Sequence, residues 1–257
     1  MSDYHCKDNP GFSEPVCQLL TLNQFLDANF KKWACHEIGW QFGFNRKLWE
    51  YAVILQAIEH YGKIGGHGLG FGVGQEPIVP VLLRHGARLL VSDLCDEEAQ
   101  ARGWSRMKFD VESTGALSFR FVDMNEIQAD LRGFDFLWSC GSLEHIGGLD
   151  HGMRFIENAM NCLRNGGFAV HTTEFTLTSN DTTYDTPALS FYRERDIVAL
   201  AKRLREKGYV LELNLNRGDH ELDRIVFAEP PPWELSLKET ICGHTITSMV
   251  LVIHKPE

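Results

Sequence analysis

The chain has 257 residues, with 25 lysines and arginines against 35 aspartates and glutamates, and its formal net charge is -10. This length is sufficient for one sizeable domain. The acidic balance repels polyanions, and the densest basic runs are interleaved with acidic residues, so the composition argues against a nucleic-acid partner.

The sequence contains no apolar run that approaches the ~20 residues of a membrane span, and its first residues lack the basic and apolar regions of a secretory signal. The seven cysteines are scattered and form no CxxC pair. An odd, dispersed set of this kind favours free thiols in a reducing compartment over disulfides or a zinc cluster. We therefore expect a cytoplasmic protein with no membrane span.

Residues 1–44 are rich in Asn, Asp, Gly and aromatic residues but show no sustained periodicity, which predicts an N-terminal cap of short helices and loops. Residues 45–257 are expected to form one domain. Asn45 has the character of a helix N-cap, and apolar residues then recur at helical spacing from Leu48 to Ile58, with the helix ending near Gly62.

Residues 65–77, "GGHGLGFGVGQEP", hold six glycines in thirteen positions. So much backbone freedom in the interior of a chain indicates that something approaches the backbone closely. A short helix is expected directly after it, over 78–83.

Compact apolar runs at 87–93, 117–123, 134–140 and 168–175 read as strands, and helical patterns lie between them. Alternating strands and helices predict an α/β fold with a doubly wound, mostly parallel sheet. The runs 209–215 and 248–255 have no comparable helix between them. We expect them to close a seven-stranded sheet as an antiparallel hairpin, with residues at about 216–245 as an insertion that includes Pro230–Trp233.

Gly68, Gly70 and Gly72 give the spacing GxGxG, whereas a dinucleotide fingerprint needs GxGxxG, so the loop argues against NAD or FAD. The loop resembles motif I of the class I S-adenosylmethionine-dependent methyltransferases, and the resemblance covers roughly residues 45–215. It implies S-adenosylmethionine as the cofactor, with the glycine backbone close to its methionine and ribose parts. Gly66 departs from the family pattern, which usually has an acidic residue there, so the cofactor's ammonium group would depend on backbone carbonyls or other side chains.

The same resemblance assigns further cofactor-binding residues. Asp93 ends the second strand, where a carboxylate would accept both ribose hydroxyls; an Asp at a strand end can also serve only as a helix cap. Asp123 and Met124 match the position that binds adenine, and Ser139 and Cys140 are expected to line the cofactor. "FDFLWSCGSLEHIGG", residues 134–148, is similar to motif IV and the segment that follows it.

Methyl transfer to a hydroxyl requires a group that removes the proton as the oxygen attacks, and a histidine suits this role. His145 is the candidate base, with Glu144 orienting it or holding the loop. The alternative is that His145 caps the next helix or packs beneath the cofactor. His171 and Glu174 are an odd number apart and should face opposite sides of their strand; Glu174, nearer the carboxyl end, is the better candidate for the site.

Asp219, His220 and Asp223 lie close together, but a solvated acidic loop explains them as well, and no metal is predicted. The loop 180–196 mixes aromatic and polar residues, which favours a polar, hydroxyl-rich acceptor.

These features together predict an S-adenosylmethionine-dependent methyltransferase that methylates a hydroxyl of a small-molecule or saccharide acceptor. An N-methyltransferase or another small-molecule methyltransferase, and a noncatalytic cofactor-binding scaffold, are the alternatives.

Overall fold

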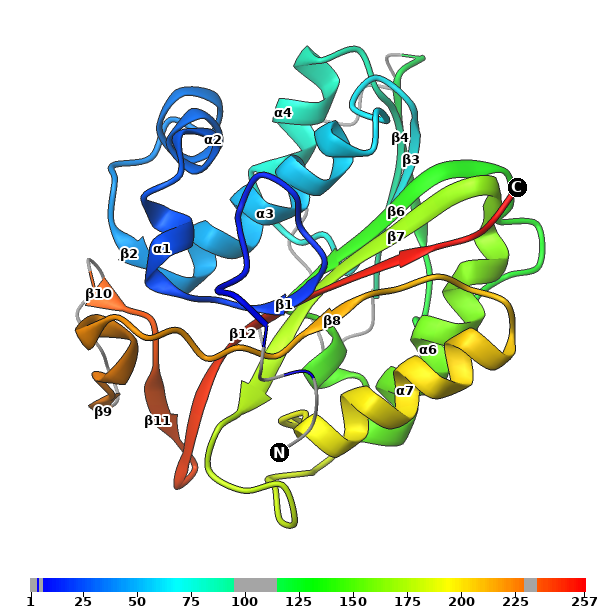
Figure 1. Ribbon diagram of the computed structural model, residues 1–257. Helices are drawn as coiled ribbons and strands as arrows, with labels where there is room; N and C mark the ends of the chain where they lie inside the picture. Colours follow the sequence, from blue (N-terminus) through cyan, green and yellow to red (C-terminus); the bar gives the residue numbers. More distant parts are fainter. Residues whose placement is uncertain (1–3, 5–6, 95–114, 229–234) are drawn as a thin grey trace.

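The computed structural model describes residue 4 and residues 7–94, 115–228 and 235–257 (Figure 1). Cys6, Cys95 and the predicted Pro230–Trp233 part of the insertion lie outside the described residues. Within the described part, a ten-stranded, mostly parallel sheet carries helices on both faces. The α/β class is therefore confirmed, but the strand number differs from the predicted seven.

Five parallel strands form the centre and one edge of this sheet, in the order β5–β4–β3–β6–β7. Their bounds are Leu117–Phe121 for β5, Arg88–Asp93 for β4, His67–Phe71 for β3, Phe134–Cys140 for β6 and Leu163–Thr176 for β7. The strand order reverses at β3, which pairs on one side with β4 and on the other with β6. Such a reversal leaves a crevice at the carboxyl ends of the strands, where ligands of doubly wound folds bind.

Two pairs of helices cover the two faces of the sheet (Figure 1). One face carries α3 (Arg46–His60) and α4 (Ile78–Arg84), and the other carries α6 (Leu149–Ala159) and α7 (Glu194–Glu206). All four helices lie where the sequence predicts helices. The Asn45 side chain caps α3 as expected, because it accepts a hydrogen bond of 3.1 Å from the Leu48 amide.

Strand β6 contributes to the hydrophobic cores on both faces. Successive side chains of a strand point to opposite faces, so Phe136 and Trp138 join the buried cluster of α3 and α4, whereas Leu137 joins that of α6 and α7. Phe136 and Trp138 are stacked at 5.9 Å between ring centroids, and neither is exposed to solvent. Both rings lie beside the glycines of β3.

The other edge of the sheet differs from the predicted hairpin. Strand β12 (His244–His254) runs antiparallel to β7, and β1 (Cys17–Leu19) separates it from β8 (Leu213–Asn214). Figure 1 shows β1, in blue, beside β12, in red. Only an isolated bridge between Val210 and His254 joins the two expected hairpin strands. The hairpin prediction is wrong because a strand from the N-terminal segment enters between its two arms.

The rest of the N-terminal segment forms short helices, as the sequence predicts. They are α1 (Leu22–Phe25), α2 (Ala28–Lys31) and a wider π-type turn at Lys32–Glu37. Trp33 is buried in this turn and its indole N–H donates a 2.8 Å hydrogen bond to Gln56 Oε1 in α3. The segment is therefore packed on α3 in addition to supplying a strand.

Short elements complete the fold. Among the described residues, 3-10 turns span Leu143–His145, Met160–Cys162 and Glu221–Arg224. Within the predicted insertion, β9 (Phe227–Ala228) and β11 (Glu239–Ile241) extend the sheet beyond β12, and β10 (Leu235–Ser236) pairs with β2 (Phe44–Asn45) in a separate two-stranded sheet.

Candidate functional site

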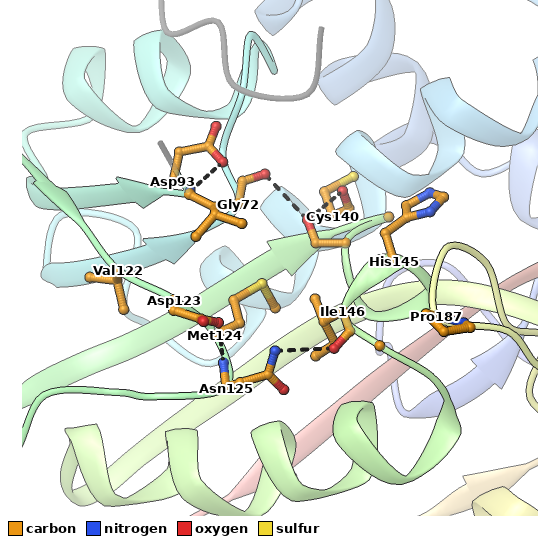
Figure 2. A pocket seen from close by; sticks show the side chains of 14 residues that line it. Gly72, Asp93, Val122, Asp123, Met124, Asn125, Cys140, His145, Ile146 and Pro187 are labelled. Atoms are coloured by element: carbon orange, nitrogen blue, oxygen red, sulfur yellow. Dashed lines mark hydrogen bonds between the residues drawn. The ribbon is translucent and has the colours of Figure 1, made fainter. Parts of the chain in front are cut away.

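A pocket of about 450 Å³ lies at the carboxyl ends of the central strands, where the strand order reverses (Figure 2). Its wall comes from the turn after β3, the end of β4, the segment after β5 and the segment after β6. The residues from these places are Gly72, Asp93–Leu94, Val122–Asn125 and Cys140–Ser142 with His145–Gly147; Pro187 completes the lining. The volume is in the range of small-molecule and cofactor sites.

The middle of the glycine-rich stretch forms strand β3, and its glycines have separate roles. Gly68 and Gly70 lie inside β3 and do not line the pocket. A Cβ on Gly68 would collide with the Phe136 ring, and one on Gly70 would lie 2.5 Å from Trp138 Cζ2. These two glycines therefore make room for aromatic rings of β6, contrary to the prediction that they make room for a ligand.

Gly72 is the member of the predicted trio that reaches the pocket. Its φ of +60° is in the left-handed region, and a Cβ there would lie 2.5 Å from Ser142 Oγ. The Ser142 hydroxyl donates to the Gly72 carbonyl at 3.3 Å. A glycine at this position therefore lets the turn after β3 approach the segment after β6.

Asp93 lies at the end of β4, as predicted, and is 7% exposed on the pocket wall. Its Oδ2 accepts a 3.1 Å hydrogen bond from the Gly74 amide, and its Oδ1 accepts one of 2.8 Å from the Leu94 amide. Burial raises the pKa of Asp93, and these two bonds oppose that shift. A carboxylate oxygen has two lone pairs, so each oxygen retains acceptor capacity for a diol.

The segment after β5 brings both predicted adenine-binding residues to the pocket. Met124 is 7% exposed and supplies an apolar surface, and Asp123 Oδ1 accepts a 2.8 Å hydrogen bond from the Asn125 amide. The Asn125 side chain in turn donates to the Ile146 carbonyl at 3.1 Å. This bond ties the segment after β5 to the segment after β6 across the pocket (Figure 2).

The two predicted residues at the end of β6 face different ways. Cys140 lines the pocket, whereas Ser139 does not, because consecutive strand residues alternate in direction. Ser139 Oγ lies 2.8 Å from His171 Nδ1 in the buried layer beneath α6. Ser139 is therefore a core residue, and His171 is held there with it.

His145 reaches the pocket wall from the 3-10 turn after β6. Its Nδ1 lies 2.8 Å from the Ala188 carbonyl oxygen. Because a carbonyl only accepts, Nδ1 carries the hydrogen, and in the neutral ring Nε2 then holds the acceptor lone pair. The loop that supplies Ala188 also supplies Pro187 to the pocket, so His145 is oriented by the same loop that closes this side of the pocket.

Glu144 does not line the pocket, although its Oε1 lies 3.3 Å from the point that a Cβ on the lining residue Gly141 would occupy, and burial raises its pKa. Its Oε2 accepts a 3.0 Å hydrogen bond from Thr173 Oγ1, and its backbone carbonyl accepts one of 2.9 Å from the Ser190 amide. Of the two roles considered for Glu144, these contacts match holding the loop.

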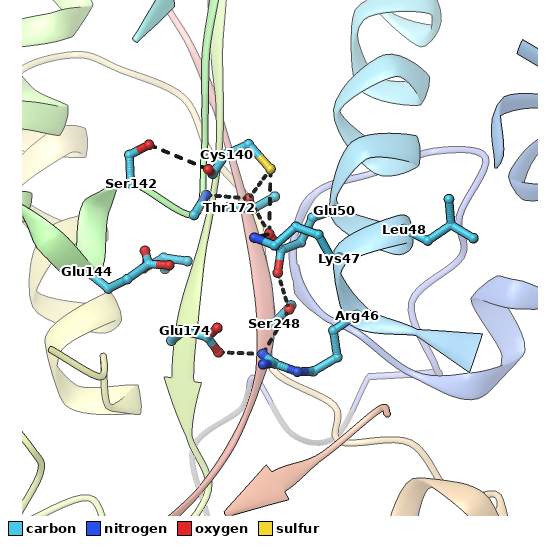
Figure 3. Close-up of polar contacts among 12 residues, drawn as sticks. Arg46, Lys47, Leu48, Glu50, Cys140, Ser142, Glu144, Thr172, Glu174 and Ser248 are labelled. Atoms are coloured by element: carbon cyan, nitrogen blue, oxygen red, sulfur yellow. Dashed lines mark hydrogen bonds and ion pairs between the residues drawn. The ribbon is translucent and has the colours of Figure 1, made fainter. Parts of the chain in front are cut away.

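Glu174 belongs to a buried group of charged side chains around the start of α3 (Figure 3). It pairs at 2.5 Å with Arg46, which also pairs with Glu239. Burial raises the pKa of Glu174 to about 7, and Arg46 opposes that shift. Glu174 does not line the pocket, so the structure does not bring it together with His145 there.

Sequence reasoning missed the second ion pair of this group, between Lys47 and Glu50 at 2.6 Å. A signal is present in the sequence. Glu50 precedes Val53, Ile54 and Ala57 by three, four and seven residues, so it lies on the apolar stripe of the helix. A carboxylate on such a stripe is buried and needs partners from other elements.

No group of three or more His, Cys, Asp or Glu side chains within the described ranges is arranged to hold a metal ion. In the acidic loop, the side chains of His220 and Asp223 form a capping box at the start of the 3-10 turn Glu221–Arg224, and Asp223 also accepts a 2.8 Å hydrogen bond from the Leu22 amide. None of the described helices is long and apolar enough to cross a lipid bilayer.

Comparison with known proteins gives remote structural likenesses alone. No family model and no curated protein matches the chain. A methyltransferase from Clostridium acetobutylicum described as S-adenosylmethionine-dependent is 13% identical, with 90% of this chain and 94% of that chain covered and a TM-score of 0.49. The CcbJ methyltransferase of Streptomyces caelestis is 12% identical, with 89% and 98% covered and a TM-score of 0.48.

The 1,6-didemethyltoxoflavin-N1-methyltransferase of Burkholderia thailandensis is 16% identical, with 81% of this chain and 77% of that chain covered and a TM-score of 0.46. Its structure holds bound 1,6-didemethyltoxoflavin and S-adenosylhomocysteine. Likenesses at this level do not assign an activity to the chain. The pocket of this chain supports the function proposed below.

Proposed function

We propose that the protein is an S-adenosylmethionine-dependent methyltransferase that methylates a hydroxyl of a small or carbohydrate-like acceptor. One observation carries the proposal. A single pocket at the strand reversal gathers Gly72, Asp93, Asp123, Met124 and His145, which come from four separate segments of the chain. A doubly wound fold binds its ligands at this place.

The pocket residues fit the parts of this cofactor. Asp93 is a nearly buried carboxylate suited to the two ribose hydroxyls. Met124 offers an apolar surface to a flat base, and Asp123 beside it offers an acceptor to an exocyclic amine. The cofactor would supply a methyl group on a sulfonium, which is electrophilic enough for direct displacement.

His145 is proposed to take the proton of the acceptor hydroxyl. The proton passes to Nε2, which holds the lone pair while Nδ1 donates to Ala188. The Ala188 carbonyl then stabilises the imidazolium, since Nδ1–H remains bonded to it. Polar atoms of Asn125 and Ser142 on the pocket wall support a hydroxyl-rich acceptor.

The test is methyl transfer from labelled S-adenosylmethionine to matched hydroxyl and amine acceptors, with wild type, His145→Ala and the control His36→Ala, whose histidine lies in the N-terminal π-type turn. We expect His145→Ala to lower the rate roughly 100-fold or more. The rate of the wild type should rise with pH through one ionisation that the variant lacks.

Different results would contradict different parts of the proposal. Normal turnover by His145→Ala would exclude this histidine as the base. Transfer to amines alone would replace O-methylation with N-methylation. Binding of S-adenosylhomocysteine with no transfer to any acceptor would favour a noncatalytic scaffold.

A further inference from the structure

The charged side chains that line the proposed pocket do not by themselves complement a zwitterionic ligand. Two of its lining side chains, Asp93 and Asp123, are acidic, and none of the described lining residues is a lysine or arginine. A ligand that ends in an amino acid brings a carboxylate into this acidic wall. A nearby cation is needed to hold that carboxylate.

Two cations lie at the start of α3, and their surroundings differ. Arg46 is 11% exposed, and its guanidinium is shared between Glu174 and Glu239 with a further bond of 3.3 Å to Ser248 Oγ. Lys47 is 39% exposed and has one ion pair, with Glu50 at 2.6 Å. An ammonium has three donors, so Lys47 retains donors beyond its bond to Glu50.

Lys47 does not itself line the pocket, but its ammonium lies behind the lining residue Gly141. Its Nζ is 2.6 Å from the point that a Cβ on Gly141 would occupy, and Gly141 lines the pocket. Gly141 has a φ of +61°, so both its backbone and the space beside it favour glycine. The glycine at this position therefore leaves the Lys47 head group next to the pocket.

Glu50 fixes the position of Lys47. It is 3% exposed, and its Oε1 accepts a 2.6 Å hydrogen bond from Ser248 Oγ, while its Oε2 faces Thr172 Oγ1 at 3.3 Å and Cys140 Sγ at 3.5 Å (Figure 3). These contacts come from β12, β7 and β6. Because residues of three strands hold its carboxylate, Glu50 is a fixed counter-ion for Lys47. The remaining N–H groups of the Lys47 ammonium therefore have a defined orientation.

The electrostatic surroundings keep Lys47 charged. Burial disfavours its ammonium, but the acidic groups around it, Glu50 foremost and Glu144 among them, together outweigh that effect and hold the pKa of Lys47 well above its usual range. The Cys140 thiol beside the pair is neutral, because burial raises its pKa well above the usual value.

We infer that Lys47 is the carboxylate-binding residue of the pocket, placed by Glu50 to hold the amino-acid end of the cofactor at the Cys140–Gly141 wall, opposite the Asp93 and Asp123 end. The inference rests on the proposed function. It gives the charged end of the ligand a partner from α3, outside the glycine-rich stretch.

The test compares ligands that differ only at this end. S-adenosylhomocysteine carries the carboxylate and the ammonium, 5'-methylthioadenosine carries neither, and the decarboxylated homologue of S-adenosylhomocysteine keeps the ammonium alone. Their dissociation constants are measured by calorimetry for wild type, Lys47→Met, Lys47→Arg and the control Lys202→Met, whose lysine lies exposed on α7.

We expect Lys47→Met to weaken S-adenosylhomocysteine roughly 10- to 100-fold, the effect of one lost hydrogen bond to a charged group. Its affinity for 5'-methylthioadenosine should stay within about two-fold, which also shows that the variant is folded. Lys47→Arg should retain most of the affinity, and Lys202→Met all of it. Wild type should bind the decarboxylated ligand weaker than S-adenosylhomocysteine, a comparison that needs no variant.

Three results would overturn the inference. Equal losses for S-adenosylhomocysteine and 5'-methylthioadenosine would make Lys47 a structural residue. Unchanged cofactor affinity with a raised KM for the acceptor would assign the lysine to an anionic group of the acceptor. Equal affinity of wild type for the carboxylated and decarboxylated ligands would exclude carboxylate recognition. If wild type binds none of these nucleosides, the proposed function itself fails, and the inference fails with it.

Discussion

The close packing around Gly70 gives the most direct structural prediction. Substitution by alanine adds one methyl group and tests which neighbouring side chain requires a glycine at this position. In Gly70→Ala the new Cβ would lie 2.5 Å from Trp138 Cζ2 and 2.6 Å from Val73 Cγ2, about 1 Å inside ordinary van der Waals contact. Trp138 is fully buried and stacked on Phe136, so the indole cannot turn away into solvent.

Overpacking of this kind costs about 1 to 3 kcal/mol, and the lower chain entropy of alanine in the unfolded state returns up to about 1 kcal/mol. We therefore expect the free energy of unfolding to fall by about 1 to 2 kcal/mol, and the melting temperature by about 2 to 8 °C. Urea unfolding followed by circular dichroism measures this change. Gly11→Ala is the matched control, because Gly11 has open space around its Cβ position and no positive φ.

A double-mutant cycle makes the assignment specific to Trp138. Trp138→Phe removes the indole atoms nearest to the added methyl, so the cost of Gly70→Ala should be smaller in that background. Wild-type stability of Gly70→Ala, or the same cost in both backgrounds, would refute the packing explanation of this glycine.

Two further predictions concern buried polar groups. Burial raises the pKa of Glu76, which is hydrogen-bonded to the Trp138 indole, from its usual 4.5 to about 8. The unfolded chain therefore loses this proton at lower pH than the folded chain, and the group's contribution to stability declines as pH rises from about 4.5 to about 8. Glu76→Gln should be more stable than wild type by ~1 kcal/mol or more near pH 8 and show no such advantage near pH 4, as measured by urea unfolding; an equal difference at both pH values would contradict the shift. The buried Tyr192 hydroxyl has no hydrogen-bond partner among the described residues, so Tyr192→Phe should leave the free energy of unfolding unchanged or raise it by up to about 1 kcal/mol, and a loss above about 1 kcal/mol would reveal a partner.

The helices and strands that the sequence predicts well are those that residues close together in the chain determine. Helix α3 begins at Arg46 because Asn45 caps it, and its apolar periodicity is continuous over four turns. Strand β4 is a compact apolar run that ends in Asp93, and the pocket begins there. Capping and periodicity are properties of neighbouring residues, so a sequence shows them directly.

The errors arise where the cause is distant in sequence. The glycines of β3 suggest a loop, but Phe136 and Trp138, more than sixty residues later, occupy the space that Gly68 and Gly70 leave. Strand β1 is three residues long, too short to show a period of two, and its place between β12 and β8 depends on pairing across the whole chain. Such pairings cannot be read from a local pattern.

The residues of the candidate site were predicted well or poorly for the same reason. The pocket is lined by residues that end or follow a strand whose carboxyl end lies there, namely Asp93, Asp123, Met124, Cys140 and His145. The Lys47–Glu50 pair was not predicted because Glu50 is held by partners on β6, β7 and β12 that only the folded chain brings together. Interactions between distant segments therefore determine which features around the site the sequence predicts poorly.

The central claim is that the pocket at the strand reversal binds S-adenosylmethionine, and calorimetry with S-adenosylhomocysteine tests it most directly. Wild type should bind this ligand and should not bind NAD. Asp93→Ala should weaken the binding by about 1.5 to 3 kcal/mol through loss of its charged hydrogen bonds, while Asp130→Ala, whose carboxylate is exposed and paired with Arg120, should have no effect. Binding of NAD in place of S-adenosylhomocysteine, or unchanged affinity in a folded Asp93→Ala variant, would contradict the account.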